Sequence, residues 1–472
     1  MRLYTLAACF FSSVAVPFVS AGPAVALCSR LELLVDRFLI ERLSGGAKLV
    51  LHHPVPREVV LVTNKPWEGN TCGYFTIFRD GPIYRMYYRG SHSARKRHHR
   101  ELTCYAESKD GIHWKRPSLG LFSFKGSKDN NIVWDGVGTH NFTPFKDPNP
   151  NCKPDEKYKA LGRGAVNGKS VLFAFKSSDG IHWSLMCKDP VITKGAFDSQ
   201  NLAFWDPIRK EYREYHRDFR NGKRDIRTGT SKDFRNWTDP VWLRYPGAPS
   251  EHLYTNQIMP YYRAPHIFIG FPTRYMPDRG SLTEGLFMTS RDGLTFLRWT
   301  EAFVRPGLNR EKWHNRSNYI WWGLVETKSD LPGAPNDLSL YVNEGYYEGG
   351  STSIRRYTIR IDGFVSVNAP MAGGELLTKP FTFEGDALFM NYSTSAAGSI
   401  RVELQDASGK PLPGFSLSDC PVIYGDTVEG RIRWKRNASL APLAGKPVRM
   451  RVVLRDADLY SFRLGSSKEK AQ

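Results

Sequence analysis

The sequence has no closely spaced cysteine pair and no long apolar stretch after its first residues. Its 7 cysteines stand at wide, irregular positions: Cys9, Cys28, Cys72, Cys104, Cys152, Cys187 and Cys420. Because no Cys-x-x-Cys pair occurs, zinc-finger and thioredoxin-like sites lose their usual signature, and we expect no metal and no cofactor. No later segment approaches the ~20 apolar residues that a membrane helix needs. The sequence therefore predicts no membrane insertion once the N-terminal segment is removed.

Acidic residues are fewer than basic ones, 47 against 66, which gives a formal net charge of +19. Such a surface attracts polyanions. The basic residues are scattered, however, and the clearest run is short, at residues 95–100. No helix-turn-helix or similar module is legible, so we expect no nucleic-acid partner. Sulfated or uronic-acid polysaccharide is the alternative polyanion, and general solubility is the other interpretation of the charge.

Residues 1–26 have the pattern of a signal peptide. Arg2 supplies the positive start, an apolar stretch runs over residues 3–19, and Val19-Ser20-Ala21 and Ala24-Val25-Ala26 are small-residue cleavage sites. An uncleaved anchor is the alternative, which the prolines after the apolar stretch disfavour. The pattern predicts a secreted or periplasmic protein, and this compartment permits disulfides whose pairing the sequence does not specify.

A repeated motif, Ser-x-Asp-x-x-x-aromatic, indicates the architecture. Its four copies start at Ser108, Ser177, Ser231 and Ser290 and end at Trp114, Trp183, Trp237 and Phe296. Their Asp residues, at positions 110, 179, 233 and 292, are 69, 54 and 59 residues apart. In a chain with 13% aromatic residues, such a period is typical of propeller blades of about four strands. Asp-Gly favours a tight hairpin turn, so we expect a structural motif whose aromatic packs between blades.

Blade openings can be placed on apolar strands, most of which follow an amide. These openings are Gly73, Asn141, Asn201, Asn256 and Asn318, which predicts five blades over roughly 70–139, 140–197, 198–250, 251–313 and 314–365. An early strand around Val59–Val62 is expected to help close the ring. We predict an all-β protein with a five-bladed β-propeller over 27–365 and a C-terminal β-sandwich over 366–472.

The Ser-x-Asp-Gly-x-x-Trp turns, the segments FTIFRDGPIYRMYYRG and NLAFWDPIRKEYREY, and the tail ADLYSFRL resemble a known superfamily. It comprises the five-bladed propeller glycoside hydrolases of families 32, 43, 62, 68 and 117, and the chain looks closest to an exported bacterial group within it. The resemblance implies a secreted glycoside hydrolase, exo-acting on a polysaccharide or oligosaccharide. Neutral and anionic substrates both remain open.

Glycoside hydrolysis needs two carboxyl groups, and in a propeller these project from the blade openings into the central funnel. Similarity to the superfamily implies Glu251, followed by His252 and Tyr254, as the general acid. It implies Asp198 as a supporting carboxylate and leaves Glu68 as the base or nucleophile. Asp135 is the weakest candidate, because Asp-Gly also forms ordinary turns.

The sequence departs from this superfamily where the inner strands normally begin with Asp. Amides stand there, and an amide binds sugar hydroxyls but does not exchange protons at neutral pH. The expected substrate-binding residues are Trp67, His140, Asn141, Asn201, His216, Arg217, His252, Asn256, Asn318 and Tyr319. A non-catalytic, lectin-like propeller is therefore the alternative to the enzyme. Sialidase chemistry is a third alternative and ranks low, because the sialidase motif has one more residue between Asp and Trp and sialidase propellers have six blades.

Overall fold

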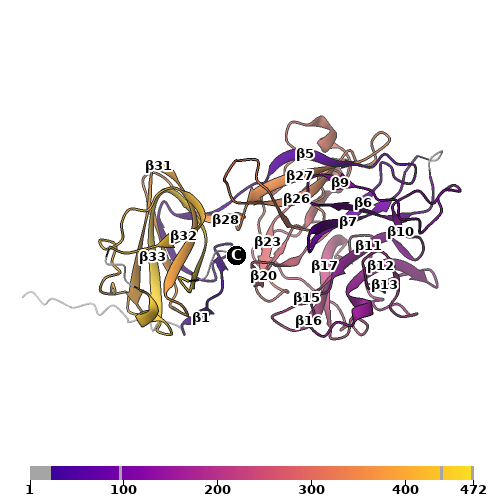
Figure 1. Cartoon of the computed structure of the whole chain (residues 1–472). Helices are drawn as coiled ribbons and strands as arrows, with labels where there is room; N and C mark the ends of the chain where they lie inside the picture. Colours follow the sequence, from indigo (N-terminus) through magenta and orange to yellow (C-terminus); the bar gives the residue numbers. More distant parts are fainter. Residues whose placement is uncertain (1–22, 95–97, 436–438, 469–472) are drawn as a thin grey trace, which may run out of the picture.

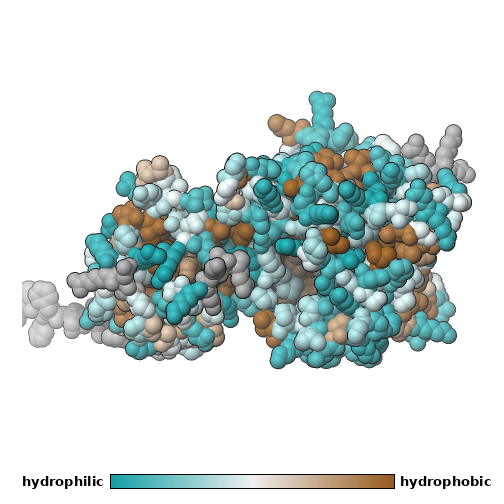
Figure 2. Space-filling view, in the orientation of Figure 1, coloured by the Kyte–Doolittle hydropathy of each residue, from teal (hydrophilic) through white to brown (hydrophobic). Residues whose placement is uncertain are grey.

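The computed structural model describes residues 23–94, 98–435 and 439–468, which form two β-rich lobes (Figure 1). The predicted signal peptide lies almost entirely outside these residues. Helical structure in the described ranges is limited to short 3₁₀ turns: η1 (Pro154–Glu156), η2 (Pro277–Arg279), η3 (Arg310–Trp313) and η4 (Ala441–Leu443). No helix in these ranges is long and apolar enough to cross a membrane. The face drawn in Figure 2 is mainly hydrophilic, with apolar residues in scattered groups.

The larger lobe is a five-bladed propeller, which confirms the predicted architecture. Blade one contains β6 (Gly73–Asp80), β7 (Ile83–Gly90), β8 (Leu102–Ser108), β9 (Trp114–Lys115) and β10 (Ile132–Trp134). Blade two contains β11 (Gly138–Lys146), β12 (Tyr158–Val166), β13 (Lys169–Ser177) and β14 (Ser184–Leu185). Blade three contains β15 (Leu202–Asp206), β16 (Glu211–Arg220), β17 (Lys223–Ser231) and β18 (Val241–Trp242).

Blade four carries an additional hairpin, and blade five is completed by the early strand. Blade four contains β19 (Met259–Tyr261), β20 (Ala264–Gly270), β23 (Met288–Ser290) and β24 (Phe296–Arg298), with the hairpin β21 (Thr273–Met276) and β22 (Leu282–Gly285). Blade five contains β25 (Val325–Thr327), β26 (Asp337–Glu344), β27 (Ser353–Arg360) and β5 (Val55–Val62). Since β5 pairs antiparallel with β27, the early strand closes the ring as expected.

The Ser-x-Asp motifs are the turns between the third and fourth strands of blades one to four. In the first, Asp110 Oδ1 accepts from the backbone N–H of Ile112 and of His113, each at 2.8 Å. The same contacts recur at Asp179, Asp233 and Asp292. The aromatic residue that ends each motif lies at the same position of its turn. In the first motif, the ring centroid of Trp114 is 6.0 Å from that of Tyr341 in blade five. The motif is structural, as predicted.

Tyrosine hydroxyls connect neighbouring blades at these turns. Tyr87 donates to the carbonyl of Gly180 at 2.8 Å, Tyr215 to that of Gly293 at 2.8 Å, and Tyr341 to that of Gly111 at 2.6 Å. Each tyrosine lies on the second strand of its blade and is buried. The third contact joins blade five to blade one, so it reinforces the closure of the ring.

The smaller lobe combines both ends of the described chain. It contains β1 (Val25–Cys28), β2 (Glu32–Leu33), β3 (Ile40–Gly45), β4 (Lys48–Leu51), β28 (Val365–Ala369), β29 (Gly374–Thr378), β30 (Phe381–Phe383), β31 (Ala387–Asp406), β32 (Asp426–Ile432) and β33 (Val448–Gly465). Its strands surround one apolar core, as the predicted sandwich requires. The placement of residues 27–51 in the propeller was wrong, because Leu27, Leu34, Leu39 and Ile40 complete this core.

Ion pairs join the two lobes. Glu32 is fully buried on β2 and accepts from Arg291 of the blade-four turn at 2.9 Å and from His266 of β20 at 3.0 Å. Burial opposes its ionisation, but the hydrogen bond from His266 and the charge of Arg291 outweigh it, so the pKa of Glu32 is lowered. The described cysteines are all free, and none forms a disulfide.

Replacing Tyr215 by Phe removes one tie between blades and leaves the buried carbonyl of Gly293 without this donor. We expect the propeller to lose about 1–2 kcal/mol of unfolding free energy, measured by urea denaturation. Tyr424→Phe is the matched control, since Tyr424 is 70% exposed in the smaller lobe. Equal stability of Tyr215→Phe and the wild type would contradict the structural role of this contact.

Candidate functional site

A pocket of about 340 Å³ lies where the five blades converge. Each blade contributes at least one side chain at or just before its inner strand, among them Tyr74, His140, Asp198, Tyr254 and Tyr319. Parts of the chain that are far apart in sequence thus meet at the propeller axis, as the predicted funnel requires. Such convergence is the usual setting of a ligand site in a concave pocket.

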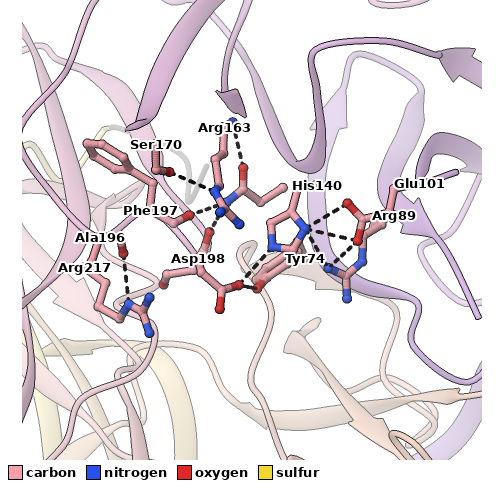
Figure 3. A network of polar contacts seen from close by, with 12 residues as sticks. Tyr74, Arg89, Glu101, His140, Arg163, Ser170, Ala196, Phe197, Asp198 and Arg217 are labelled. Atoms are coloured by element: carbon pink, nitrogen blue, oxygen red, sulfur yellow. Dashed lines mark hydrogen bonds and ion pairs between the residues drawn. The ribbon is translucent and has the colours of Figure 1, made fainter. Parts of the chain in front are cut away.

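One imidazole connects two carboxylates in this pocket (Figure 3). His140 Nδ1 lies 2.9 Å from Glu101 Oε2, and His140 Nε2 lies 2.9 Å from Asp198 Oδ1. The imidazole ring therefore lies between the two carboxylates and contacts both of them. His140 and its two partners are called the acid–histidine–acid chain below.

Both carboxylates are held ionised. Partial burial opposes ionisation of Asp198, but the hydrogen bond and charge of His140 and the charge of Arg217 outweigh it, so its pKa lies well below the usual range. The pKa of Glu101 is lowered in the same way by His140 and Arg89 against burial. Each ring nitrogen of His140 thus faces a carboxylate oxygen, which accepts hydrogen bonds when ionised.

Arg89 contacts the acid–histidine–acid chain through Glu101. Its guanidinium lies 3.3 Å from Glu101 Oε1 and donates to Tyr346 Oη at 2.6 Å, while stacking over the Tyr74 ring at 4.9 Å. Arg89 also approaches His140 Nδ1 at 3.3 Å, but the shorter contact to Glu101 makes this nitrogen a donor. The buried cation therefore fixes the orientation of Glu101 and of the pocket floor.

Two buried amides hold the loop that carries Asp198. Asn141 Nδ2 donates to the carbonyls of Phe197 and Ser199 at 2.7 and 2.5 Å, and Asn201 Nδ2 donates to the same carbonyls at 3.1 Å each. Both amides are fully buried. The backbone is thus held on both sides of Asp198. These contacts orient the Asp198 carboxylate toward His140.

Aromatic side chains form another part of the wall. Tyr319 stacks on Trp321 with ring centroids 5.1 Å apart, and Tyr254 meets Tyr319 edge-on at 5.7 Å. Within the described residues, the hydroxyls of Tyr254 and Tyr319 make no hydrogen bond to protein. Flat rings with free hydroxyls suit a sugar, whose faces are apolar and whose edges are polar.

Three residues with a strained backbone line this pocket. Tyr74, Arg316 and Tyr347 line it and have φ values of 55°, 56° and 67°, in the left-handed region that residues with a Cβ rarely adopt. Such conformations cost about 1–3 kcal/mol each and persist where surrounding structure enforces them, often at functional sites.

Of the sequence-predicted residues, Asp198, His140 and Tyr319 line this pocket. Sequence reasoning missed Glu101, Arg89, Tyr74 and Arg316. Glu101 directly follows the basic run at residues 95–100, which drew attention to charge and away from the acid beside it. Tyr74 was recognised as part of a blade opening but was not given a role in the site.

The structure contradicts the expectation that Glu251 faces the funnel. Its carboxylate accepts from Arg274 Nε at 2.6 Å and forms an ion pair with Arg298 of β24. Both arginines belong to blade four, so local charge pairing turns Glu251 away from the axis. Its neighbour His252 is also outside the pocket, where its Nδ1 accepts from the backbone of Arg224 at 3.1 Å.

Glu68 is likewise absent from the pocket wall. Its side chain is fully buried, accepts from Tyr88 and pairs with Arg116 Nε at 2.8 Å. A carboxylate enclosed by these donors has no access to substrate. Trp67, beside it, is held by a hydrogen bond from Nε1 to Asn131 at 2.6 Å and does not line the pocket.

The amides and the remaining polar candidates are structural, which corrects their expected contact with sugar. Besides Asn141 and Asn201, Asn256 donates to the carbonyls of Gln200 and Tyr215, and Asn318 to those of Thr283 and Lys312. His216 is buried against Glu214, and Arg217 donates to the carbonyl of Ala196. Backbone carbonyls thus accept from the amides and from Arg217, and His216 pairs with Glu214.

No protein-family model and no curated protein matches the chain. Solved structures with a similar fold include a glycoside hydrolase, at 14% identity and TM-score 0.44 over 65% of this chain and 92% of its own. A second belongs to a family of mannoside phosphorylases containing glycoside hydrolases that target β-1,2-mannosidic linkages in Candida mannan; it is 15% identical, with TM-score 0.44 over 65% and 94% of the two chains.

A third is an N-acetylgalactosamine deacetylase from F. plautii in complex with blood group B trisaccharide, at 11% identity and TM-score 0.43 over 67% and 96% of the two chains. At these identities and scores, the likeness assigns neither an activity nor a substrate to this chain. The resemblance to families 32, 43 and 117 stays a prediction.

Glu251→Gln tests the correction made above. Loss of one charge partner for Arg274 and Arg298 should lower the unfolding free energy by about 1–3 kcal/mol, measured by thermal or urea unfolding. Ligand binding and turnover should stay within about twofold of the wild type, because the residue is outside the pocket. A fall in turnover of about 10²-fold or more in a folded variant would restore Glu251 as a catalytic candidate.

His140→Gln should raise the pKa of Asp198, because the variant removes the imidazole that favours its carboxylate form. Wild-type Asp198 should remain ionised near about pH 3, where an ordinary Asp side chain is mostly protonated. Infrared difference spectra between each protein and its Asp198→Asn counterpart report the carboxylate band over pH. An unchanged titration of Asp198 in His140→Gln would show that the contact at 2.9 Å does not control this group.

Proposed function

We propose that the chain is an exported glycoside hydrolase whose reaction takes place in the axial pocket. The observation that carries this proposal is the acid–histidine–acid chain, in which two carboxylates of lowered pKa lie on either side of the His140 imidazole. Glycosidic bond cleavage requires one group to supply a proton and another to accept one, and this chain contains both. Free tyrosine hydroxyls and Trp321 beside it suit the hydroxyls and ring face of a sugar.

The pKa directions decide the roles. Asp198 and Glu101 are both ionised, so neither is a proton donor in the resting protein, and a glycosidase acid of raised pKa is missing among them. We assign His140 and Asp198, whose Nε2 and Oδ1 atoms lie 2.9 Å apart, as the pair that exchanges protons with the bound sugar. Glu101 is the carboxylate that positions the His140 ring.

Hydrolysis adds water across the glycosidic carbon–oxygen bond: water supplies the oxygen for the new bond to the anomeric carbon and releases a proton, while the leaving oxygen keeps the electron pair of the broken bond and takes up a proton. His140 and Asp198 are the groups of the pocket that exchange these protons, and their 2.9 Å contact connects the two sites.

The size of the pocket favours action at a chain end. Its volume of about 340 Å³ is at the small end of the range for ligand pockets, so a terminal sugar is a better fit than the interior of a chain. Export follows from the signal-peptide pattern. Because Val25–Cys28 pairs with β30, cleavage after Ala21 preserves the fold, whereas cleavage after Ala26 would remove half of β1.

Asp198→Asn and His140→Gln should each reduce turnover by about 10²- to 10⁴-fold, since each removes a proton-transfer group. Activity is measured as product release from a panel of neutral, sulfated and uronic-acid oligosaccharides. Short products released progressively from intact polysaccharide would support action at chain ends.

Matched controls are Asp239→Asn and His182→Gln, whose side chains are 81% and 68% exposed on the outside of the propeller. They should keep normal turnover. Near-normal turnover of folded Asp198→Asn would overturn the assigned roles. Binding of sugars without any product would favour the lectin-like alternative, in which the same aromatic wall holds a glycan.

A further inference from the structure

Arg316 differs from the other arginine that lines the axial pocket. Arg89 is paired with Glu101, whereas Arg316 has no acidic partner within the described residues, and its hydrogen bond goes from Nη1 to Tyr347 Oη at 3.0 Å. Its Nε is buried and has no hydrogen-bond partner. Arg316 is half-buried, and its guanidinium faces the pocket without the carboxylate partner that Arg89 has, so an anion in the pocket can pair with it.

Aromatic rings hold this guanidinium in place. It lies 5.4 Å from the ring centroid of Tyr347 and 6.0 Å from that of Tyr254. The backbone is fixed as well, since the N–H of Arg316 donates to Ser281 at 3.1 Å and that of Tyr347 to Asn70 at 2.8 Å. Both residues are nevertheless in the left-handed region. These contacts thus hold Arg316 and Tyr347 in a strained backbone conformation, with the Arg316 guanidinium at the pocket.

We propose that Arg316 binds a carboxylate or sulfate on the sugar that occupies the axial pocket. The planar guanidinium offers paired donors that match the oxygens of either group, and the free hydroxyls of Tyr254 and Tyr319 complete the site. The substrate class is then an anionic glycan, either uronic or sulfated. Turnover of an anionic glycan rests on the proposed hydrolysis, whereas binding of its anionic group to Arg316 does not.

The position of Arg316 relative to the acid–histidine–acid chain agrees with this role. The Arg316 guanidinium lies 6.0 Å from the Tyr254 ring centroid, and Arg316, Tyr254, Tyr319 and Asp198 all line the same pocket. One sugar can place its anionic group at Arg316 and its anomeric carbon toward Asp198.

The alternative is that the tyrosine rings alone satisfy Arg316, as cation–π contacts do in many folds. The test compares binding of glucuronate, glucose 6-sulfate and glucose to the full-length protein by saturation-transfer NMR at low salt. In the wild type, at least one anionic sugar should bind about 10-fold or more tightly than glucose. The arm that binds distinguishes a carboxylate site from a sulfate site.

Arg316→Met should abolish this preference while leaving glucose binding within about twofold, and Arg316→Lys should retain part of it. Arg279→Met, at an exposed position, is the control. Equal binding of all three sugars to the wild type, or an unchanged preference in folded Arg316→Met, would overturn the proposal. If Arg316→Met does not fold, Arg316→Lys decides in its place, and an undiminished preference there would also overturn it.

The two proposals fail separately. Preferential binding of an anionic sugar without turnover of any glycan would refute hydrolysis and leave the anion site intact. Turnover of neutral and anionic glycans at equal kcat/KM would refute the anion site and leave hydrolysis intact.

Discussion

The pairing of β5 with β27 is the interaction on which the rest of the molecule depends. It joins a strand from the start of the described chain to the last blade, and it brings Tyr74 of blade one and Tyr319 of blade five to the same pocket. Since the pocket takes at least one side chain from each blade, its geometry exists only in the closed ring. The Tyr341 hydroxyl on Gly111 reinforces the same seam with a contact between side chain and backbone.

The sequence predicted features that depend on local chemistry. The Ser-x-Asp turns are local hydrogen-bonded units, so their spacing sufficed to count the blades, and Asp198 was found because it directly precedes an inner strand. Glu251 followed the same logic and was wrong, because two arginines from its own blade bind it. Long charged side chains pair with whichever partner the fold brings close, and spacing along the sequence does not indicate which partner that is.

Other parts of the site could not be predicted for a related reason. Glu101 reaches the pocket because β8 pairs with β7 and brings it beside Arg89 and His140, which are 12 and 39 residues away in sequence. The amides were recognised but misinterpreted. A buried amide and a ligand-binding amide look the same in a sequence, and only the carbonyls of Phe197 and Ser199 show that Asn141 and Asn201 serve the loop of Asp198.

The smaller lobe takes strands from both sides of the propeller, so the propeller is an insertion within it (Figure 1). The two crossing points are adjacent, because Leu51 of β4 pairs with Val365 of β28. During synthesis, β1 to β4 stay without their partner strands until more than three hundred further residues have been added. Apolar strands that stay unpaired are exposed to aggregation, so the smaller lobe is the part of this protein most at risk until synthesis of the C-terminal strands is complete.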